Sequence, residues 1–161
     1  MARTHRLQRS QRIERPIAEV FAFFADAANL QALTPPFLGF EILTPQPIAM
    51  HAGARIDYKI SLLGVPMIWR TLISTWEPNQ RFVDEQLSGP YAKWHHTHSF
   101  EAEGNATVMR DVVEYRMPLG VLGSAARVLF VARTLDKIFD YRSEATERAL
   151  ERSAGGALEL V

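Results

Sequence analysis

The sequence predicts an α+β fold: a curved antiparallel sheet of seven strands, two short helices after the first strand, and one long carboxy-terminal helix across the sheet. Three observations predict this arrangement. The apolar residues change from helical spacing to alternate spacing and back along the chain. Short turn signals separate the alternating runs, and connections this short favour antiparallel neighbours. A sheet and an amphipathic helix bury their apolar faces against each other, so we expect the two to enclose a cavity.

The amino-terminal segment changes from strand to helix. Residues 7–13 have the pattern of a short polar strand. Pro16 then stands in a favoured first-turn position, and the apolar residues after it have helical spacing as far as Phe24. Asp26 is a suitable cap for a second short helix, which must end at the prolines of residues 34–36 because proline cannot continue a helix.

The middle of the chain consists of extended runs between turn signals rich in glycine, proline and asparagine. Period-two alternation within these runs predicts strands with one face toward a core. The six predicted strands cover residues 40–43, 54–62, 67–76, 81–87, 91–101 and 106–116.

After Gly120 the apolar residues return to helical spacing and predict one helix over residues 121–153. The pair Gly155 and Gly156 ends the helical pattern. We therefore expect a single domain over residues 1–161, with a core of about residues 5–153 and a flexible tail over residues 154–161.

The composition excludes several classes of protein. Eighteen basic and eighteen acidic residues give a net charge of zero, which argues against nucleic-acid binding. The chain has no cysteine, so it has no disulfide, thiol nucleophile or thiolate-held metal. No apolar run approaches the roughly 20 residues of a membrane span, and the start lacks the apolar stretch of a secretory signal. We expect a cytoplasmic protein, a monomer or homodimer, with no stable membrane insertion.

The segment around residues 94–100 points several polar and aromatic side chains to one face of the sheet. A two-residue turn at Gly104 and Asn105 would give cross-strand pairs whose residue numbers sum to 209. The same reasoning applied around Ser88 and Gly89 would set Phe82 beside His96 and Asp84 beside Trp94. The pairs expected from the first turn are Phe100 with Met109, His98 with Asp111, His96 with Val113 and Trp94 with Tyr115.

A buried Asp111 requires a partner, because an unpaired buried carboxylate costs several kcal/mol. Three interpretations of its neighbourhood stay open: a structural pair with His98, a polar group that orients a ligand, and a histidine that acts as general acid or base with Asp111 as its partner. A metal held by His96 and His98 with Asp84 or Asp111 is a weaker alternative, and we predict none. Arg142, on the apolar stripe of the last helix, could pair with an inner carboxylate or extend its charge to water, and we favour the second.

Signatures of cofactor chemistry are missing. The chain contains no nucleophile elbow, phosphate loop or dinucleotide fingerprint. Two of the three lysines, Lys59 and Lys93, point outward in the predicted register, which disfavours a Schiff base. We predict no cofactor.

The order of elements and several short motifs resemble the START-like or SRPBCC superfamily, in particular its bacterial polyketide cyclase/dehydrase-like branch. The resemblance covers nearly the whole chain, and it implies a helix-grip fold with a cavity for lipids, polyketides or other hydrophobic molecules. It fixes no single activity, because the superfamily includes transporters, receptors and cyclases. The motifs include Arg15-Pro16-Ile17, Phe24-Ala25-Asp26, Thr34-Pro35-Pro36, Trp76-Glu77-Pro78, Gly89-Pro90 and Pro118-Leu119-Gly120.

We expect the protein to bind a small hydrophobic ligand, such as a lipid or polyketide, between the sheet and the last helix. Two alternatives are a cofactor-independent polyketide cyclase or dehydratase, with His98 and Asp111 catalytic, and an interaction module whose cavity is filled by its own side chains. Phe37 and Leu38 are candidates for the cavity mouth. The predicted ligand-binding residues are Tyr58, Trp69, Phe82, Asp84, Trp94, His96, His98, Phe100, Asp111 and Tyr115.

Overall fold

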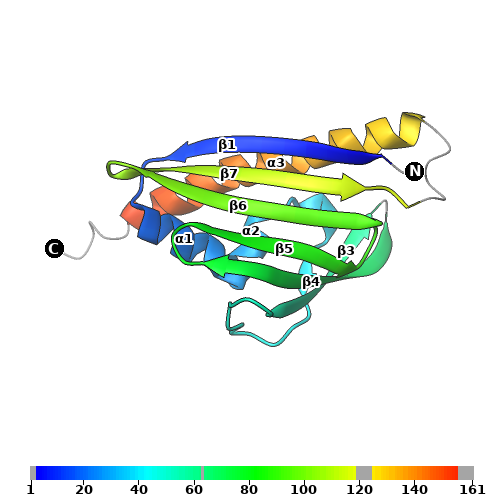
Figure 1. Ribbon diagram of the computed structural model, residues 1–161, viewed down its shortest axis with the longest axis horizontal. Coiled ribbons are helices and arrows are strands. Elements are labelled where there is room, and N and C mark those ends of the chain that lie inside the picture. Colours follow the sequence, from blue (N-terminus) through cyan, green and yellow to red (C-terminus); the bar gives the residue numbers. More distant parts are fainter. Residues whose placement is uncertain (1–2, 63, 119–124, 156–161) are drawn as a thin grey trace.

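The chain forms a seven-stranded antiparallel sheet in the order β1-β7-β6-β5-β4-β3-β2 (Figure 1). This computed structural model describes residues 3–62, 64–118 and 125–155. The strands are β1 (Thr4–Ile13), β2 (Glu41–Ile42), β3 (Arg55–Leu62), β4 (Val65–Glu77), β5 (Arg81–Ser88), β6 (Lys93–Glu103) and β7 (Ala106–Arg116). The helices are α1 (Ile17–Ala25), α2 (Leu30–Leu33) and α3 (Ala125–Gly155), with 3-10 helices η1 (Ala27–Asn29) and η2 (Pro36–Leu38).

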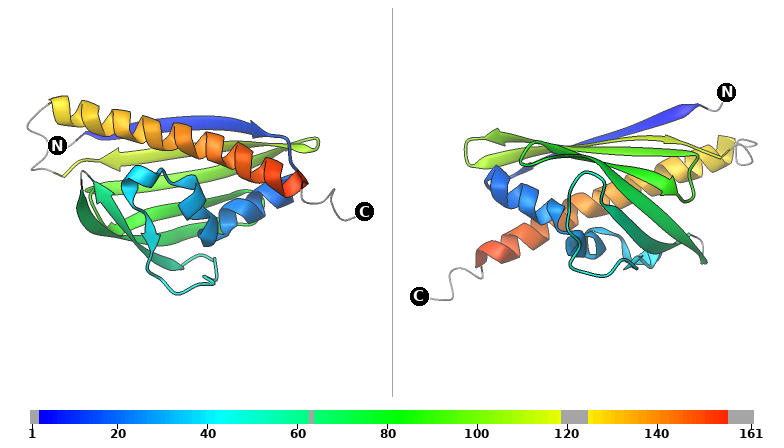
Figure 2. Two further views of the ribbon diagram at one scale, coloured as in Figure 1. Left: turned by 180° about the vertical axis from the view of Figure 1, so that it is seen from behind. Right: turned by 60° about the horizontal axis from the view of Figure 1, so that its bottom comes forward.

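Helix α3 crosses one face of the curved sheet, and α1 and α2 lie on that same side (Figure 2). This arrangement confirms the predicted fold class, with the long helix, the short helices and the antiparallel meander in the expected order. Within the described residues, no helix is both long and apolar enough to span a membrane.

Helix α1 forms where the sequence predicts, and its apolar face explains why it packs on the sheet. Val20, Phe21 and Phe24 are spaced to share one face, and all three are buried. Burial of each side chain contributes roughly 1.5–3 kcal/mol. Asp26 then caps the following turn, because its carboxylate accepts a hydrogen bond from the backbone N–H of Ala28 at 2.9 Å.

The β6–β7 register agrees with the prediction. Phe100 pairs with Met109, His98 with Asp111 and Trp94 with Tyr115, as a two-residue turn at residues 104–105 requires. The alternation of this hairpin therefore places His96 and His98 on the inner face of the sheet, where both are buried.

The β5–β6 register differs from the prediction by two residues. Phe82 pairs with His98 and Asp84 with His96, and four residues connect the strands, whereas the predicted strands 81–87 and 91–101 leave three. The amide of Gln86 donates to the backbone oxygen of Tyr91 at 2.6 Å and stabilises this wider loop. A slip of two residues leaves every side chain on its predicted face.

Parts of several predictions lie outside the described residues. These are Leu63 in the β3–β4 connection, the turn after Pro118, the start of the last helix at residues 121–124, and residues 156–161 of the predicted tail. Helix α3 continues as far as Gly155, two residues beyond its predicted end.

Candidate functional site

A cavity of about 180 Å³ lies between the inner face of the sheet and the helices. One water molecule needs roughly 10–15 Å³ by the same kind of measure, so the space is an order of magnitude larger. Its wall is mostly apolar or aromatic, and its carboxylate, imidazole and guanidinium groups come from β5, β6 and α3. The wall consists of Phe24, Ala27, Leu30, Leu33, Thr34, Leu38, Phe40, Met50, Ile56, Tyr58, Ile60, Leu62, Trp69, Thr71, Ile73, Phe82, Asp84, Tyr91, Trp94, His96, His98, Thr134, Leu135, Ile138, Phe139 and Arg142.

Most of the predicted ligand-binding residues lie on this wall, but Phe100, Asp111 and Tyr115 do not. Phe100 is covered by α1, since its ring centroid lies 5.2 Å from that of Phe21. Tyr115 stacks on His5 of β1 at 5.3 Å. The predicted residues on the wall are Tyr58, Trp69, Phe82, Asp84, Trp94, His96 and His98.

The two candidates for the cavity mouth differ in position. Leu38 is buried and lines the cavity, whereas Phe37 is 58% exposed and is not part of the wall. A role for Phe37 at an entrance stays a prediction.

The helices also contribute side chains to the wall, which the sequence pattern does not predict. The stripe on α3 predicted that Leu135 and Phe139 are buried, and both are. Helical spacing does not distinguish a side chain packed on the sheet from one that faces a void, so it gave no signal for the cavity. Tyr91, in the loop before β6, was missed because residues 91–101 were predicted as one strand, in which alternation places Tyr91 on the face opposite to His96 and His98.

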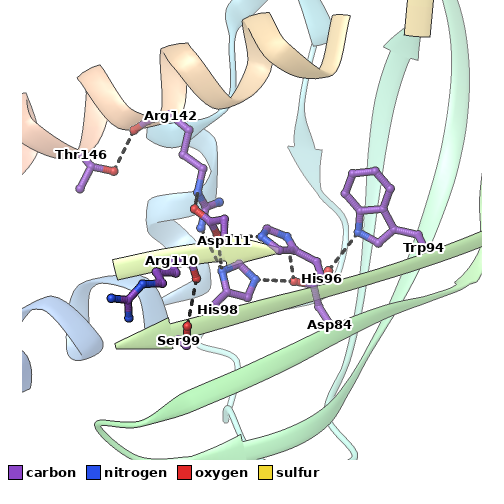
Figure 3. Close-up of polar contacts among 9 residues, drawn as sticks. All are labelled: Asp84, Trp94, His96, His98, Ser99, Arg110, Asp111, Arg142 and Thr146. Carbon is purple, nitrogen blue, oxygen red and sulfur yellow. Dashed lines mark hydrogen bonds and ion pairs between the residues drawn. The ribbon is translucent and has the colours of Figure 1, made fainter. Parts of the chain in front are cut away.

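Four polar side chains from three neighbouring strands meet beside the cavity, and we refer to Asp84, His96, His98 and Asp111 as the His–Asp cluster (Figure 3). Nε2 of His96 lies 2.7 Å from Oδ1 of Asp111, and Nε2 of His98 lies 2.6 Å from Oδ2 of Asp84. Nδ1 of His98 lies 3.1 Å from Oδ1 of Asp111. The cluster therefore links β5, β6 and β7 from the inside.

Arg142 extends from α3 toward the cluster, and the prediction that its charge reaches water is wrong. Its guanidinium Nε lies 3.7 Å from Oδ2 of Asp111, and Nη2 lies 3.2 Å from Nδ1 of His98. The guanidinium also lies over the ring of Phe24, 5.1 Å from its centroid. The contact with Asp111 offsets the cost of burying the charge of the guanidinium.

The contacts and burial shift the ionisation of every member of the cluster. Burial raises the pKa of Asp111, but the charge of Arg142 and the two histidines outweigh burial and hold that pKa well below its ordinary value. The pKa of Asp84 is lowered too: burial raises it, but His96 and His98 outweigh that effect. Both carboxylates are therefore ionised at neutral pH.

The two histidines shift in opposite directions. Burial, together with repulsion from His98, lowers the pKa of His96, so this ring is neutral and donates Nε2–H to Asp111. Burial also lowers the pKa of His98, but hydrogen bonds to Asp111 and Asp84 outweigh burial and raise it above its ordinary value. With His98 protonated, two anions and two cations balance in the buried site.

Nδ1 of His98 has two alternative partners. In the imidazolium it carries a proton and donates to Asp111, whereas in the neutral ring its lone pair accepts from Nη2 of Arg142. Arg142 and the proton therefore compete for the same nitrogen. This arrangement can hold or release one proton beside the cavity without leaving the nitrogen unpaired.

A metal ion is a further occupant to consider, because Asp84, His96 and His98 each offer a ligand atom and these atoms lie within 4.8 Å of one another. The histidines already have carboxylate partners, since Nε2 of His98 donates to Asp84 and Nε2 of His96 donates to Asp111. The nearby guanidinium of Arg142 also repels a cation. Direct pairing therefore accounts for the cluster without an ion.

The raised pKa of His98 predicts a stability that decreases at alkaline pH. The stabilisation from its bound proton is complete below the unfolded pKa of about 6.5 and is lost as pH rises through the folded pKa. Urea unfolding between pH 6.5 and 9 should show this loss in the wild type and not in His98→Gln. The control is His95→Gln, on the outer face of the same strand, which should keep the wild-type slope. Equal slopes in wild type and His98→Gln would contradict the assigned proton.

Comparisons with known proteins agree on one fold. A family model described as polyketide cyclase/dehydrase and lipid transport matches residues 13–138. A search of curated proteins gives no significant match.

Solved structures with the same fold come from several bacteria. An aromatase/cyclase from Streptomyces sp. R1128 is 12% identical, with a TM-score of 0.77 over 94% of this chain and 96% of that one. A START superfamily protein from Mycobacterium smegmatis is 14% identical, with a TM-score of 0.68 over 92% of this chain and 98% of that one. A nucleoside-diphosphate sugar epimerase from Corynebacterium glutamicum is 25% identical, with a TM-score of 0.65 over 90% of this chain and 29% of that one.

Proposed function

Because the chain belongs to the polyketide cyclase/dehydrase and lipid transport family, we propose that it binds a small hydrophobic molecule in the cavity between the sheet and α3. The observation that carries the proposal is the unfilled volume of about 180 Å³ behind an apolar wall. An interaction module whose own side chains fill its interior would not need such a space. Ligand pockets typically combine a mostly apolar wall with a few polar groups, as this one does.

The aromatic part of the wall suits a flat or extended apolar ligand. The ring of Trp69 is stacked with Tyr58 at a centroid distance of 5.7 Å and meets Trp94 edge to face at 5.1 Å. The ring centroid of Tyr91 lies 4.9 Å from that of Trp94, so Tyr91 belongs to the same aromatic group. Because these rings already pack against one another, their side chains lose little conformational entropy when a ligand binds. They therefore provide contact area at low entropic cost.

A titration with the neutral fluorescent probe N-phenyl-1-naphthylamine tests this proposal. We expect one saturable site, with energy transfer from tryptophan to the probe, because Trp69 and Trp94 both line the cavity. A probe signal that stays linear in concentration, or that does not depend on tryptophan excitation, would contradict binding in the cavity. Native mass spectrometry of the freshly purified protein complements the titration by identifying any organic molecule retained from the cell.

A cofactor-independent cyclase or dehydratase is the second candidate, and the position of His98 favours it. His98 is on the cavity wall, and its contacts with Asp84 and Asp111 favour the protonated ring. An imidazolium in this position can act as a general acid toward a substrate carbonyl, and positioning of the chain would supply much of the remaining rate.

For this second candidate, His98→Gln should lower kcat on a linear poly-β-ketone thioester by roughly 10²–10⁴-fold while KM changes little. His95→Gln is the matched control and should keep both values. If His98→Gln changes turnover and probe affinity equally, His98 has no catalytic role, and the result supports a binding protein.

A further inference from the structure

Two buried side-chain polar atoms have no hydrogen-bond partner in the described part of the chain, Nε1 of Trp69 and Nε of Arg142. Both are N–H donors, and both residues line the cavity. Buried polar groups are almost always hydrogen-bonded, so each exception requires an explanation. Two residues of the wall therefore hold unpaired donors, and a ligand that brings acceptor atoms could satisfy them.

The two donors differ in how far the protein itself satisfies them. Nε of Arg142 lies 3.7 Å from Oδ2 of Asp111, so a carboxylate already balances its charge. The indole of Trp69 is only 7% exposed, and the rings that contact it belong to Tyr58, Tyr91 and Trp94. Trp69 therefore holds the donor that most needs a partner from outside the chain.

Trp94 provides a comparison within the same cavity. Its indole Nε1 donates to Oδ1 of Asp84 at 3.3 Å, so the protein satisfies this donor. Trp69 and Trp94 both place an indole side chain on the cavity wall. They differ in whether the indole N–H has a hydrogen-bond acceptor within the described residues. The unpaired state of Trp69 is thus a property of its position and not of tryptophan in this cavity.

On the basis of the ligand binding proposed above, we propose that the ligand is an uncharged hydrophobic molecule with a carbonyl oxygen that accepts a hydrogen bond from Nε1 of Trp69. The ligand needs no charge, because Asp84 and Asp111 are balanced inside the protein by Arg142 and His98. An anionic ligand would leave an uncompensated charge in an apolar cavity. Trp69 is then the residue that determines which end of the ligand enters this part of the cavity.

Two probes of similar shape test this inference, 2-acetonaphthone with a ketone oxygen and 2-ethylnaphthalene without one. Their affinities are measured by displacement of N-phenyl-1-naphthylamine. Trp69→Phe keeps an aromatic ring and removes the donor, so it should weaken 2-acetonaphthone binding about tenfold, or 1.4 kcal/mol, and leave 2-ethylnaphthalene within about twofold. Trp94→Phe is the matched control, because its donor is already used by Asp84, and it should not change the ratio of the two affinities.

A second measurement needs no variant. The carbonyl stretch of 2-acetonaphthone bound to the wild type should lie at lower frequency than in hydrocarbon solvent, as expected for a ketone that accepts a hydrogen bond. Two results would overturn the inference and leave the binding function intact. One is an unshifted carbonyl stretch, and the other is a tenfold loss of affinity for both probes in a folded Trp69→Phe protein. If neither probe displaces N-phenyl-1-naphthylamine and that dye does not bind either, the proposed function itself fails, and this inference fails with it.

Discussion

Replacing Asp111 by alanine is expected to lower the free energy of unfolding by about 3–5 kcal/mol, which is the usual cost of removing one partner from a buried ion pair. Asp111 contacts three groups: His96 at 2.7 Å, His98 at 3.1 Å and Arg142 at 3.7 Å. The substitution leaves the guanidinium of Arg142 buried without an adjacent carboxylate. A loss of this size is a large part of the roughly 5–15 kcal/mol that stabilises a typical domain.

Urea denaturation measures this effect, and the chain offers a matched control. Asp57 also pairs with an arginine, Arg70 at 2.9 Å, but on the outer face of the sheet. Asp57→Ala should therefore cost no more than about 1 kcal/mol. The double variant Asp111→Ala/Arg142→Met should recover stability relative to Asp111→Ala, because it removes the unpaired charge. If Asp111→Ala costs no more than Asp57→Ala, the buried cluster does not stabilise the fold as described.

Filling the cavity at Ala27 is expected to weaken binding of N-phenyl-1-naphthylamine more than tenfold. Ala27 is 4% exposed, lies on η1 and lines the cavity, so a phenyl ring added by Ala27→Phe occupies space that the probe needs. Overpacking costs roughly 1–3 kcal/mol where the added ring does not fit, so unfolding is measured alongside binding.

Ala28→Phe is the control for this substitution. Ala28 is the next residue of the same 3-10 helix, and it is exposed. The same ring at this position should leave the affinity unchanged. Equal loss in both variants, or unchanged affinity in a folded Ala27→Phe protein, would mean that the probe binds somewhere other than the cavity.

The sequence predicts a register well where a turn has a clear type. Gly104 and Asn105 predict the β6–β7 pairs, and the structure confirms them. The β5–β6 connection contains Gly89 and Pro90 but uses four residues, and its length depends on the contact between Gln86 and Tyr91. Such a contact between a side chain and a loop cannot be inferred from turn propensities.

The candidate site is less predictable, because it depends on how the helices lie over the sheet. Alternation predicts that His96 and His98 face inward, but it does not predict that Phe100 lies under α1. Arg142 points inward because α3 lies over the sheet at a position that brings its guanidinium close to Asp111. Among the described residues the N–H of Trp69 has no partner, and this depends on three-dimensional packing, for which the sequence gives no signal.

The family match over residues 13–138 confirms the resemblance to the START-like superfamily. Because the Streptomyces aromatase/cyclase and the Mycobacterium START superfamily protein share at most 14% of residues with this chain, they show the fold alone. The function of this chain therefore has to be inferred from the residues of its cavity.

The central claim is that a hydrophobic molecule occupies the space between the sheet and α3. A crystal structure of the wild type grown with 2-acetonaphthone tests it most directly. We predict density for the probe against Trp69 and Trp94, with its ketone oxygen within hydrogen-bond distance of Nε1 of Trp69. A cavity closed by the protein's own side chains, with the probe on the outer surface or absent, would contradict the claim.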